Sequence, residues 1–216
     1  MQDFTYQLVK IDEYFDKIFY INMKKDQYRN EKMLEQFQKF GISNFERVEG
    51  AELIRFPQES HYRNFNKKDE KYIRGSLGCR ESHIECIRRS KSRGYRRILI
   101  LEDDIIFLQD PNLLLTQNHE ILNDWDLLYF SGIVEPFFRN QIVCAHAYAI
   151  KSTLYDDILN MAVSSGMEID NFYAKVLQHM SYNYNQSGKY NIRVILPFNQ
   201  IIQDKSYDSN IQTPNT

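Results

Sequence analysis

Three adjacent carboxylates that follow an apolar run are the strongest chemical signal in the sequence. Residues 98–101 read Ile-Leu-Ile-Leu and lead directly into Glu102, Asp103 and Asp104. Adjacent carboxylates repel one another and resist burial unless positive charge lies nearby. On an extended backbone Glu102 and Asp104 point to the same side, so they could bind one divalent cation, Asp104 directly and Glu102 directly or through water. These hard oxygen ligands suit Mn²⁺ or Mg²⁺, whose coordination substrate phosphates commonly complete. An exposed acidic turn or a helix cap is the alternative.

The acids need a sheet to hold them, and the chain alternates predicted strands with predicted helices. Strands are expected at residues 16–22, 45–48, 96–101, 126–130, 142–150 and 193–196. Helices are expected to begin near Asp26, near Ser76 or Ser82, at Ser152 and at Asp170. This alternation predicts an α/β fold with a central, mainly parallel sheet flanked by helices. In such sheets, ligands bind at the carboxyl ends of the strands, where the acids would lie.

The chain is expected to form one domain over residues 1–212, with a fraying tail at 213–216. Residues 51–74 lack clear periodicity, and we expect a flexible loop there at the rim of a cleft. Ser82 to Glu85 has the form of a helix capping box. Cys79 and Cys86 share one face of the same predicted helix and are expected to be small core residues.

The overall charge excludes some classes of partner. Lys and Arg number 27 and Asp and Glu 29, so the net charge of −2 gives no bulk attraction for nucleic acid, and no nucleic-acid partner is expected. No apolar run approaches the ~20 residues of a membrane-spanning helix, and the first residues lack the features of a signal peptide. Three cysteines are too few for a disulfide scaffold. We therefore expect reduced thiols and a cytoplasmic location, in the host cytoplasm if the chain is viral.

Seven short motifs occur in a fixed order between residues 16 and 212. They are Ile21-Asn22-Met23 with Arg29, Gly75 through Gly78-Cys79 to Ser82-His83, Leu101 to Asp104, Asp124 to Leu128, His146 to Ile150, Ile169 to Phe172, and Pro197 through Gln203 to Ser209. In this order and at this spacing they resemble glycosyltransferase family 25, which comprises bacterial lipopolysaccharide glycosyltransferases and procollagen galactosyltransferases. Ser76 stands where the family often has Glu, and residues 52–74 do not match the family pattern.

The resemblance implies a GT-A-type nucleotide-sugar fold and a hexosyltransferase of glycan biosynthesis. It implies inverting transfer of a hexose, often galactose, from a UDP-sugar to a hydroxyl of a glycan or protein-linked acceptor, usually with Mn²⁺. Such a reaction needs a cation for the diphosphate leaving group and a base for the acceptor proton. A metal-dependent phosphohydrolase and a non-catalytic sugar-nucleotide or glycan-binding domain are the alternatives.

Several motif residues are candidates for binding the donor. Asn22 ends the first predicted strand and could bind the uracil or ribose, or only form a strand-end turn. Arg29 could contact phosphate, or lie solvated on its helix. Asp103 could bind the ribose or the donor sugar, and Gly78 allows close approach of the backbone.

Four more polar residues are candidates with structural alternatives. Ser82 and His83 could contact donor phosphate or sugar, although a lone histidine is often structural. His146 is a possible ligand on a strand, or a core histidine. Gln203 could complete the metal shell or bind the diphosphate, or be a buried structural amide.

Asp170 is the candidate general base. Its position at a predicted helix start, within the acidic motif, would keep its carboxylate ionised at neutral pH. The alternative is that Asp170 is an ordinary N-cap of that helix.

Overall fold

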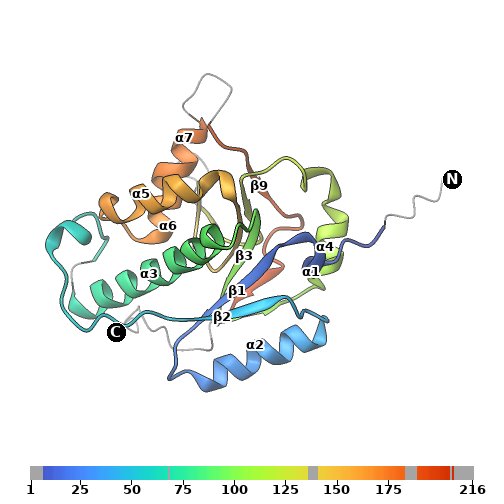
Figure 1. Ribbon diagram of the computed structural model, residues 1–216, viewed down its shortest axis with the longest axis horizontal. Coiled ribbons are helices and arrows are strands. Elements are labelled where there is room, and N and C mark those ends of the chain that lie inside the picture. Colours follow the sequence, from blue (N-terminus) through green and yellow to red (C-terminus); the bar gives the residue numbers. More distant parts are fainter. Residues whose placement is uncertain (1–6, 68, 136–140, 183–188, 205, 207–216) are drawn as a thin grey trace.

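The structure, a computed structural model, describes residues 7–67, 69–135, 141–182, 189–204 and 206. A central six-stranded sheet has the order β2-β1-β3-β8-β5-β9 (Figure 1). Its strands are β1 (Lys17–Asn22), β2 (Phe45–Glu49), β3 (Arg97–Glu102), β5 (Leu127–Tyr129), β8 (Ala147–Lys151) and β9 (Ile192–Val194). Five of them run in one direction and only β8 runs opposite. The predicted α/β fold with a mainly parallel sheet is therefore confirmed.

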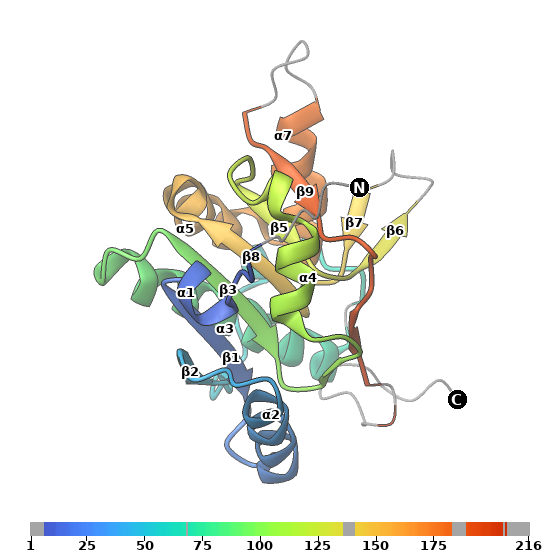
Figure 2. The same cartoon turned by 90° about the vertical axis from the view of Figure 1, so that its right-hand side faces the viewer.

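Helices cover both faces of the sheet (Figure 2). One layer holds α1 (Ile11–Tyr14), α2 (Gln27–Lys39) and α4 (Pro111–Gln117), and the other α3 (Glu70–Ser92), α5 (Tyr155–Ser165) and α6 (Ile169–Phe172). A π-helical segment, Tyr173–Gln178, and α7 (His179–Tyr182) continue from α6. Alternate strand residues point to opposite faces. Leu99 of β3 accordingly packs in the core with Phe37 of α2, whereas Ile100 packs with Ile84 of α3.

The strand order reverses at β1, and this reversal creates the place for a site. The chain passes from β1 to β2 on one side and later to β3 on the other, so β1 lies between two parallel neighbours. Ile21 near the end of β1 is in register with Glu102 at the end of β3. Ligands in α/β sheets bind in the crevice at such a reversal, beyond the carboxyl ends of the strands.

Two small sheets extend the crevice. β4 (Ile105–Phe107) pairs antiparallel with β10 (Ile201–Gln203), so Gln203 lies beside Ile105. The amide of Asp204 also donates to the Asp104 carbonyl at 2.6 Å. β6 (Ile133–Glu135) pairs with β7 (Gln141–Val143). The pairing of β10 with β4 thus places Gln203 and Asp204 next to Asp104, about a hundred residues earlier in the sequence.

The predicted start of the long third helix is wrong. α3 begins at Glu70, and the carboxylate of Asp69 accepts the Tyr72 amide at 2.9 Å as its N-cap. Ser82 lies in the helix interior, so the expected capping box is not formed. The physical reason is a short apolar stripe at helical spacing, Ile73 and Leu77, which packs on Phe65 and extends the helix toward the N-terminus.

The strand expected at 142–150 is two strands, because the backbone turns between them. Cys144 has a φ of 79°, in the left-handed region that strands do not adopt. β7 therefore ends at Val143, and β8 begins at Ala147.

Residues 51–67 contain one 3-10 turn, Glu59–His61, and otherwise no regular element. The amide of Asn64 donates to the Gly166 carbonyl at 3.0 Å, and Arg80 donates to the carbonyls of His61 and Met167, each at 3.0 Å. The helical start at Glu70 shortens the expected loop, whose flexibility stays a prediction. Residues 213–216, the expected tail, lie outside the described residues, as does Ser209.

Burial predicts very different costs for two isoleucine truncations. Ile100 is fully buried in the sheet, whereas Ile54 is 95% exposed. Ile100→Ala is expected to lower the free energy of unfolding by about 2–5 kcal/mol through lost burial and a residual cavity. The control, Ile54→Ala, is expected to change it by less than about 0.5 kcal/mol. Urea denaturation measures both, and equal effects would contradict the placement of β3 in the core.

Candidate active site

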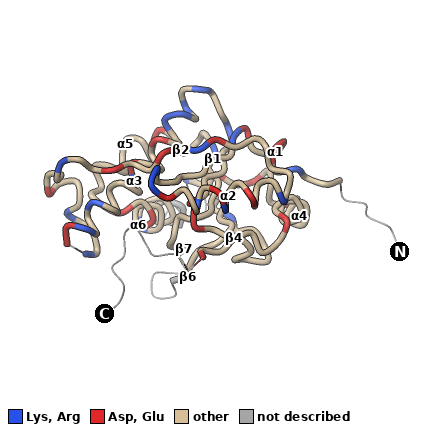
Figure 3. The backbone as a smooth tube through the Cα atoms, turned by 90° about the horizontal axis from the view of Figure 1, so that it is seen from below, with Lys and Arg blue, Asp and Glu red and all other residues tan. Residues whose placement is uncertain are grey.

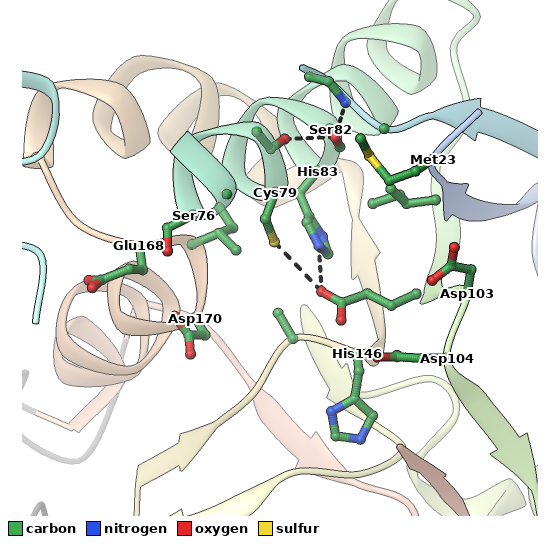
Figure 4. Close-up of a pocket in the computed structure, with 18 of the residues that line it drawn as sticks. Met23, Ser76, Cys79, Ser82, His83, Asp103, Asp104, His146, Glu168 and Asp170 are labelled. Atoms are coloured by element: carbon green, nitrogen blue, oxygen red, sulfur yellow. Dashed lines mark hydrogen bonds and ion pairs between the residues drawn. The ribbon is translucent and has the colours of Figure 1, made fainter. Parts of the chain in front are cut away.

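A cavity of about 470 Å³ opens at the carboxyl ends of β1 and β3 (Figure 4). Its wall includes every sequence-predicted site residue except Asn22, namely Arg29, Gly78, Ser82, His83, Glu102, Asp103, Asp104, His146, Asp170 and Gln203. Figure 4 shows Glu168 and Asp170 on one side, Asp103 and Asp104 on the other, and Cys79 and His83 between them. Residues distant in sequence are thus brought together as the motifs predict.

Two hydrogen bonds, from Asn22 of β1 and Arg29 of α2, hold the carboxylate of Asp103 in place. The Asn22 side-chain amide donates to Asp103 Oδ2 at 2.6 Å, and Arg29 Nη1 donates to Oδ1 at 3.1 Å. Burial raises the pKa of Asp103 by more than these two partners lower it. Asn22 is itself buried and also donates to the carbonyl of Asp26 at 3.0 Å. In this structure the Asn22 side chain contacts Asp103 and does not line the cavity.

Asp104 has one satisfied and one unsatisfied carboxylate oxygen. Oδ2 accepts from Gln203 Nε2 at 2.9 Å and lies 3.9 Å from Arg29 Nη1. Oδ1 is buried and has no hydrogen-bond partner among the described residues. Burial, followed by the charge of Glu102, raises the pKa of Asp104 to about 7. A buried acceptor without a donor beside like charge fits a divalent cation, which supplies both contact and charge.

Glu102 turns toward α3. Its Oε1 lies 3.2 Å from His83 Nε2 and 3.7 Å from Cys79 Sγ. Burial raises the pKa of Glu102, but the hydrogen bond and charge of His83 outweigh it and hold that pKa below its ordinary value. His83 Nδ1 in turn lies 2.7 Å from the hydroxyl of Tyr148, which lies 3.1 Å from that of Tyr173.

Cys79 is not the core residue that the sequence predicts. Cys86 is fully buried as expected, but Cys79 lines the cavity and donates to Glu102. Burial and the charge of Glu102 raise the pKa of its thiol well above the usual value. The seven-residue spacing placed both thiols on one face of α3 but could not show that this face passes from the core into the cavity.

Gly78 and Ser82 fix the loop after β2. A Cβ at Gly78 would lie 2.3 Å from the Ala51 carbonyl oxygen. Ser82 Oγ accepts the Ala51 amide at 2.9 Å and donates to the Gly78 carbonyl at 2.7 Å. The close approach that Gly78 permits is therefore between α3 and the chain itself, and the two residues shape the cavity wall at Ala51.

His146 is paired beside the acids. Its Nε2 lies 2.5 Å from Ser131 Oγ, and its carbonyl accepts the Glu102 amide at 2.9 Å. Burial lowers the pKa of the His146 imidazole, although the negative charge of Glu102 acts in the opposite direction and raises it. The backbone of His146 thus fixes the end of β3, while its side chain lines the cavity.

Asp170 and Glu168 differ in how far their oxygens are engaged. Glu168 occupies the N-cap position of α6 and accepts from the Asn66 amide, the Tyr72 hydroxyl and the Asn171 side chain at 2.7, 3.0 and 2.9 Å. Asp170 lies in the first turn, so the N-cap alternative for it is wrong. Its Oδ1 accepts the Asn171 amide at 2.8 Å. Burial, then the charges of Glu168 and Glu102, raise its pKa despite that bond.

Two cations are among the cavity residues that the sequence prediction missed. Lys25 and Arg74 line the cavity together with Arg29. Arg74 is also bound to Glu70 Oε1 at 2.8 Å and to the Leu53 carbonyl at 2.9 Å. Charges of both signs are interspersed along the chain in Figure 3, so this local group could not be found from net charge. The available signal was position, since Lys25 follows the first strand and Arg74 precedes the glycine motif.

The Gly78 contact predicts the sign of a substitution. At an open helical position Gly→Ala stabilises by about 0.5–1 kcal/mol. Gly78→Ala is instead expected to lower the free energy of unfolding by about 1–3 kcal/mol, because the new methyl group overlaps the Ala51 carbonyl. Ser82→Ala removes the two hydrogen bonds of the Ser82 hydroxyl without a clash and is expected to cost about 1–3 kcal/mol. Stabilisation by Gly78→Ala in thermal or urea unfolding would contradict this packing.

A family model and a curated relative both indicate the same protein family. Residues 15–151 match glycosyltransferase family 25, described as an LPS biosynthesis protein family. A "Glycosyltransferase 25 family member" of Drosophila pseudoobscura pseudoobscura is 32% identical over 129 residues, which are 53% of this chain and 20% of that protein. The chain thus spans about a fifth of that relative. Asp170 and Gln203 lie beyond the family match, so only the structure brings them to the acids.

One solved structure shares a similar chain path. It is "a glycosyltransferase involved in the glycosylation of the major capsid of PBCV-1", with 14% identity, a TM-score of 0.48, and coverage of 82% of this chain and 81% of that one. None of the described helices has the length and apolar character needed to cross a membrane. With its family match over residues 15–151, the chain belongs to glycosyltransferase family 25.

Proposed function

We propose that the protein transfers a hexose, such as galactose, from a UDP-sugar to a hydroxyl of a glycan or protein-linked acceptor, with inversion and with Mn²⁺ or Mg²⁺. One arrangement supports this function above others: a single cavity holds the unsatisfied carboxylate oxygen of Asp104 and, on its opposite side, the carboxylate of Asp170. Its volume of about 470 Å³ falls in the range of small-molecule sites, about 300–1,000 Å³.

Asp104 would be the principal cation ligand, with Glu102 as the second, directly or through water. When bound, the cation would neutralise charge on the diphosphate leaving group. Arg29, Lys25 and Arg74 line the same cavity and would add positive charge around the phosphates.

Asp103 would contact the ribose or donor sugar, because Asn22 and Arg29 fix its carboxylate at the cavity wall. Asn22 then acts as a positioning residue. Gly78 and Ser82 would shape the donor site because they fix the position of Ala51. His83 would do so because it orients the carboxylate of Glu102. Gln203 would orient Asp104.

Asp170 would accept the acceptor's proton as general base. Its raised pKa makes its carboxylate a stronger base than an ordinary aspartate, and transfer requires its ionised form. Glu168 is the nearest competing acid, but its oxygens are occupied by Asn66, Tyr72 and Asn171. The difference in engagement favours Asp170.

Asp104→Asn tests the cation site. The variant is expected to lose Mn²⁺-dependent donor binding and keep its fold, because the amide retains the size of the carboxylate but not its charge. Thermal shift with UDP-galactose and a panel of other UDP- and GDP-sugars, with Mn²⁺ or EDTA, measures this. A donor at about 100 times its Kd stabilises the wild type by about 2.7 kcal/mol.

Asp124→Asn is the control for Asp104→Asn, because Asp124 pairs with Arg193 on the surface with 57% of its side chain exposed. It is expected to keep the full donor shift. Full donor binding by Asp104→Asn that EDTA does not change would contradict the metal assignment.

Asp170→Asn tests the base. The variant is expected to keep donor affinity and to lose transfer by about 10²–10⁴-fold, because an amide cannot accept the proton. UDP release with a panel of simple glycosides as acceptors measures the rate, and NMR of the product's anomeric configuration tests inversion.

Asp156→Asn is the matched control, since this aspartate on α5 has 67% of its side chain exposed. Near wild-type transfer by Asp170→Asn would make Asp204 the next candidate base. Joint loss of donor binding and thermal stability would instead make Asp170 structural. Donor binding without turnover in the wild type would favour the non-catalytic binding domain.

A further inference from the structure

Cys79, His83 and Glu102 present a sulfur, a nitrogen and an oxygen to one another at the cavity wall. We propose that these three side chains bind a divalent transition-metal ion of the Zn²⁺ type, at a site that shares Glu102 with the proposed Asp104 site but does not use the Asp104 carboxylate. Their ligand atoms all lie within 4.8 Å of one another. The site does not depend on the proposed sugar transfer.

Two rigid elements bring the three ligands together. Cys79 and His83 are four residues apart on α3, so they lie one above the other on the same helical face. Glu102 ends β3, and its Oε1 lies within hydrogen-bond reach of Cys79 and His83, which Figure 4 shows beside each other on α3. No loop rearrangement is needed to form the set.

Both separations from the Glu102 oxygen match the edges of a tetrahedral metal site, and the Cys79 sulfur and the His83 nitrogen lie within 4.8 Å of each other. With bonds of ~2.0–2.1 Å to nitrogen or oxygen and ~2.3 Å to sulfur, tetrahedral neighbours lie roughly 3.3 Å (N to O) and roughly 3.5 Å (S to O) apart. His83 Nε2 lies 3.2 Å and Cys79 Sγ 3.7 Å from Glu102 Oε1. A fourth position would face the cavity, which all three residues line. Three protein ligands with one open position are typical of catalytic zinc sites.

The surroundings of His83 suit a metal ligand. For Nε2 to bind a cation, Nδ1 must carry the ring hydrogen and donate it, here to the Tyr148 hydroxyl at 2.7 Å. Tyr148 can then donate its own hydrogen to Tyr173, at 3.1 Å. Binding would release one proton from the Cys79 thiol to solvent, and neutral His83 would exchange its Nε2 hydrogen for one on Nδ1, with no net proton change at the ring. The thiolate and the Glu102 carboxylate would then balance the 2+ charge.

The donor set distinguishes this site from the one at Asp104. Thiolate and imidazole prefer Zn²⁺ and similar ions, whereas carboxylates alone prefer Mn²⁺ or Mg²⁺. Without a metal, the same atoms satisfy one another by hydrogen bonds, with Cys79 and His83 donating to Glu102. A purely hydrogen-bonded cluster is therefore the outcome that would overturn the proposal.

Cobalt titration of the metal-free full chain tests the site under reducing conditions. Co²⁺ held by a thiolate absorbs in the near ultraviolet through sulfur-to-metal charge transfer, and tetrahedral Co²⁺ has intense visible bands. We expect both in the wild type at one equivalent, and displacement of Co²⁺ by Zn²⁺. Absence of the charge-transfer band in the folded wild type overturns the proposal.

Variants assign the ligand. Cys79→Ser is expected to lose the charge-transfer band and at least about 100-fold in Zn²⁺ affinity, since even loss of an outer contact costs about 10–100-fold. Cys144→Ser is the matched control, because Cys144 also lines the cavity, and it is expected to keep the band. Loss of the band in Cys144→Ser with its retention in Cys79→Ser overturns the assignment.

Two further variants separate the possible failures. Glu102→Gln retains every cysteine and is expected to weaken Zn²⁺ binding at least about tenfold with an unchanged circular dichroism spectrum, which keeps the test decisive if Cys79→Ser does not fold. Unchanged affinity in Glu102→Gln contradicts the site. Asp104→Asn is expected to keep the cobalt band, so failure of the donor site and failure of this site give different results.

Discussion

Mutual repulsion of three carboxylates at the end of a buried strand is the constraint on which the site depends. Each acid is relieved by a different part of the chain: Glu102 by α3, Asp103 by α2 and the end of β1, and Asp104 by β10. Arg29 is the cation that contacts two of the acids. One guanidinium does not balance three carboxylates, and burial, together with the charge of Glu102, raises the pKa values of Asp103 and Asp104 despite Arg29.

The topology of the sheet explains why the three carboxylates lie close together with too little positive charge beside them. Reversal of strand order at β1 opens a crevice at the carboxyl ends of β1 and β3. The side chains of Glu102, at the end of β3, and of the next residue diverge there, so Glu102 contacts His83 of α3 while Asp103 accepts from Asn22 of β1. Burial of the uncompensated charge costs stability, and such costs are concentrated in proteins where a cationic ligand or substrate relieves them.

Local sequence patterns predicted most of the fold, but they did not predict which residues each side chain contacts. Alternating strands and helices and the apolar run before Glu102 were visible in the sequence, because burial imposes them residue by residue. The partner of Asp104 was not, since Gln203 reaches it only through the pairing of β10 with β4. Nor could spacing show that Cys79 leaves the core while Cys86 stays in it. Glu168 and Asp170 lie two residues apart at the start of α6, and only the hydrogen bonds from Asn66, Tyr72 and Asn171 identify Glu168 as the cap.

One helix sets the geometry of the whole cavity. α3 orients Glu102 through His83, supports Glu168 through the Tyr72 hydroxyl, and fixes Ala51 through Ser82. These contacts reach both sides of the cavity, so the separation between the acids of β3 and those of α6 is set by positions along a single rigid element. A rotation or shift of α3 would move Glu102 and the α6 cap together. Gly78 permits the observed position of α3, because a side chain there would force the helix away from the Ala51 carbonyl. The glycine thus influences the distance between the acids of β3 and those of α6 without contacting either group.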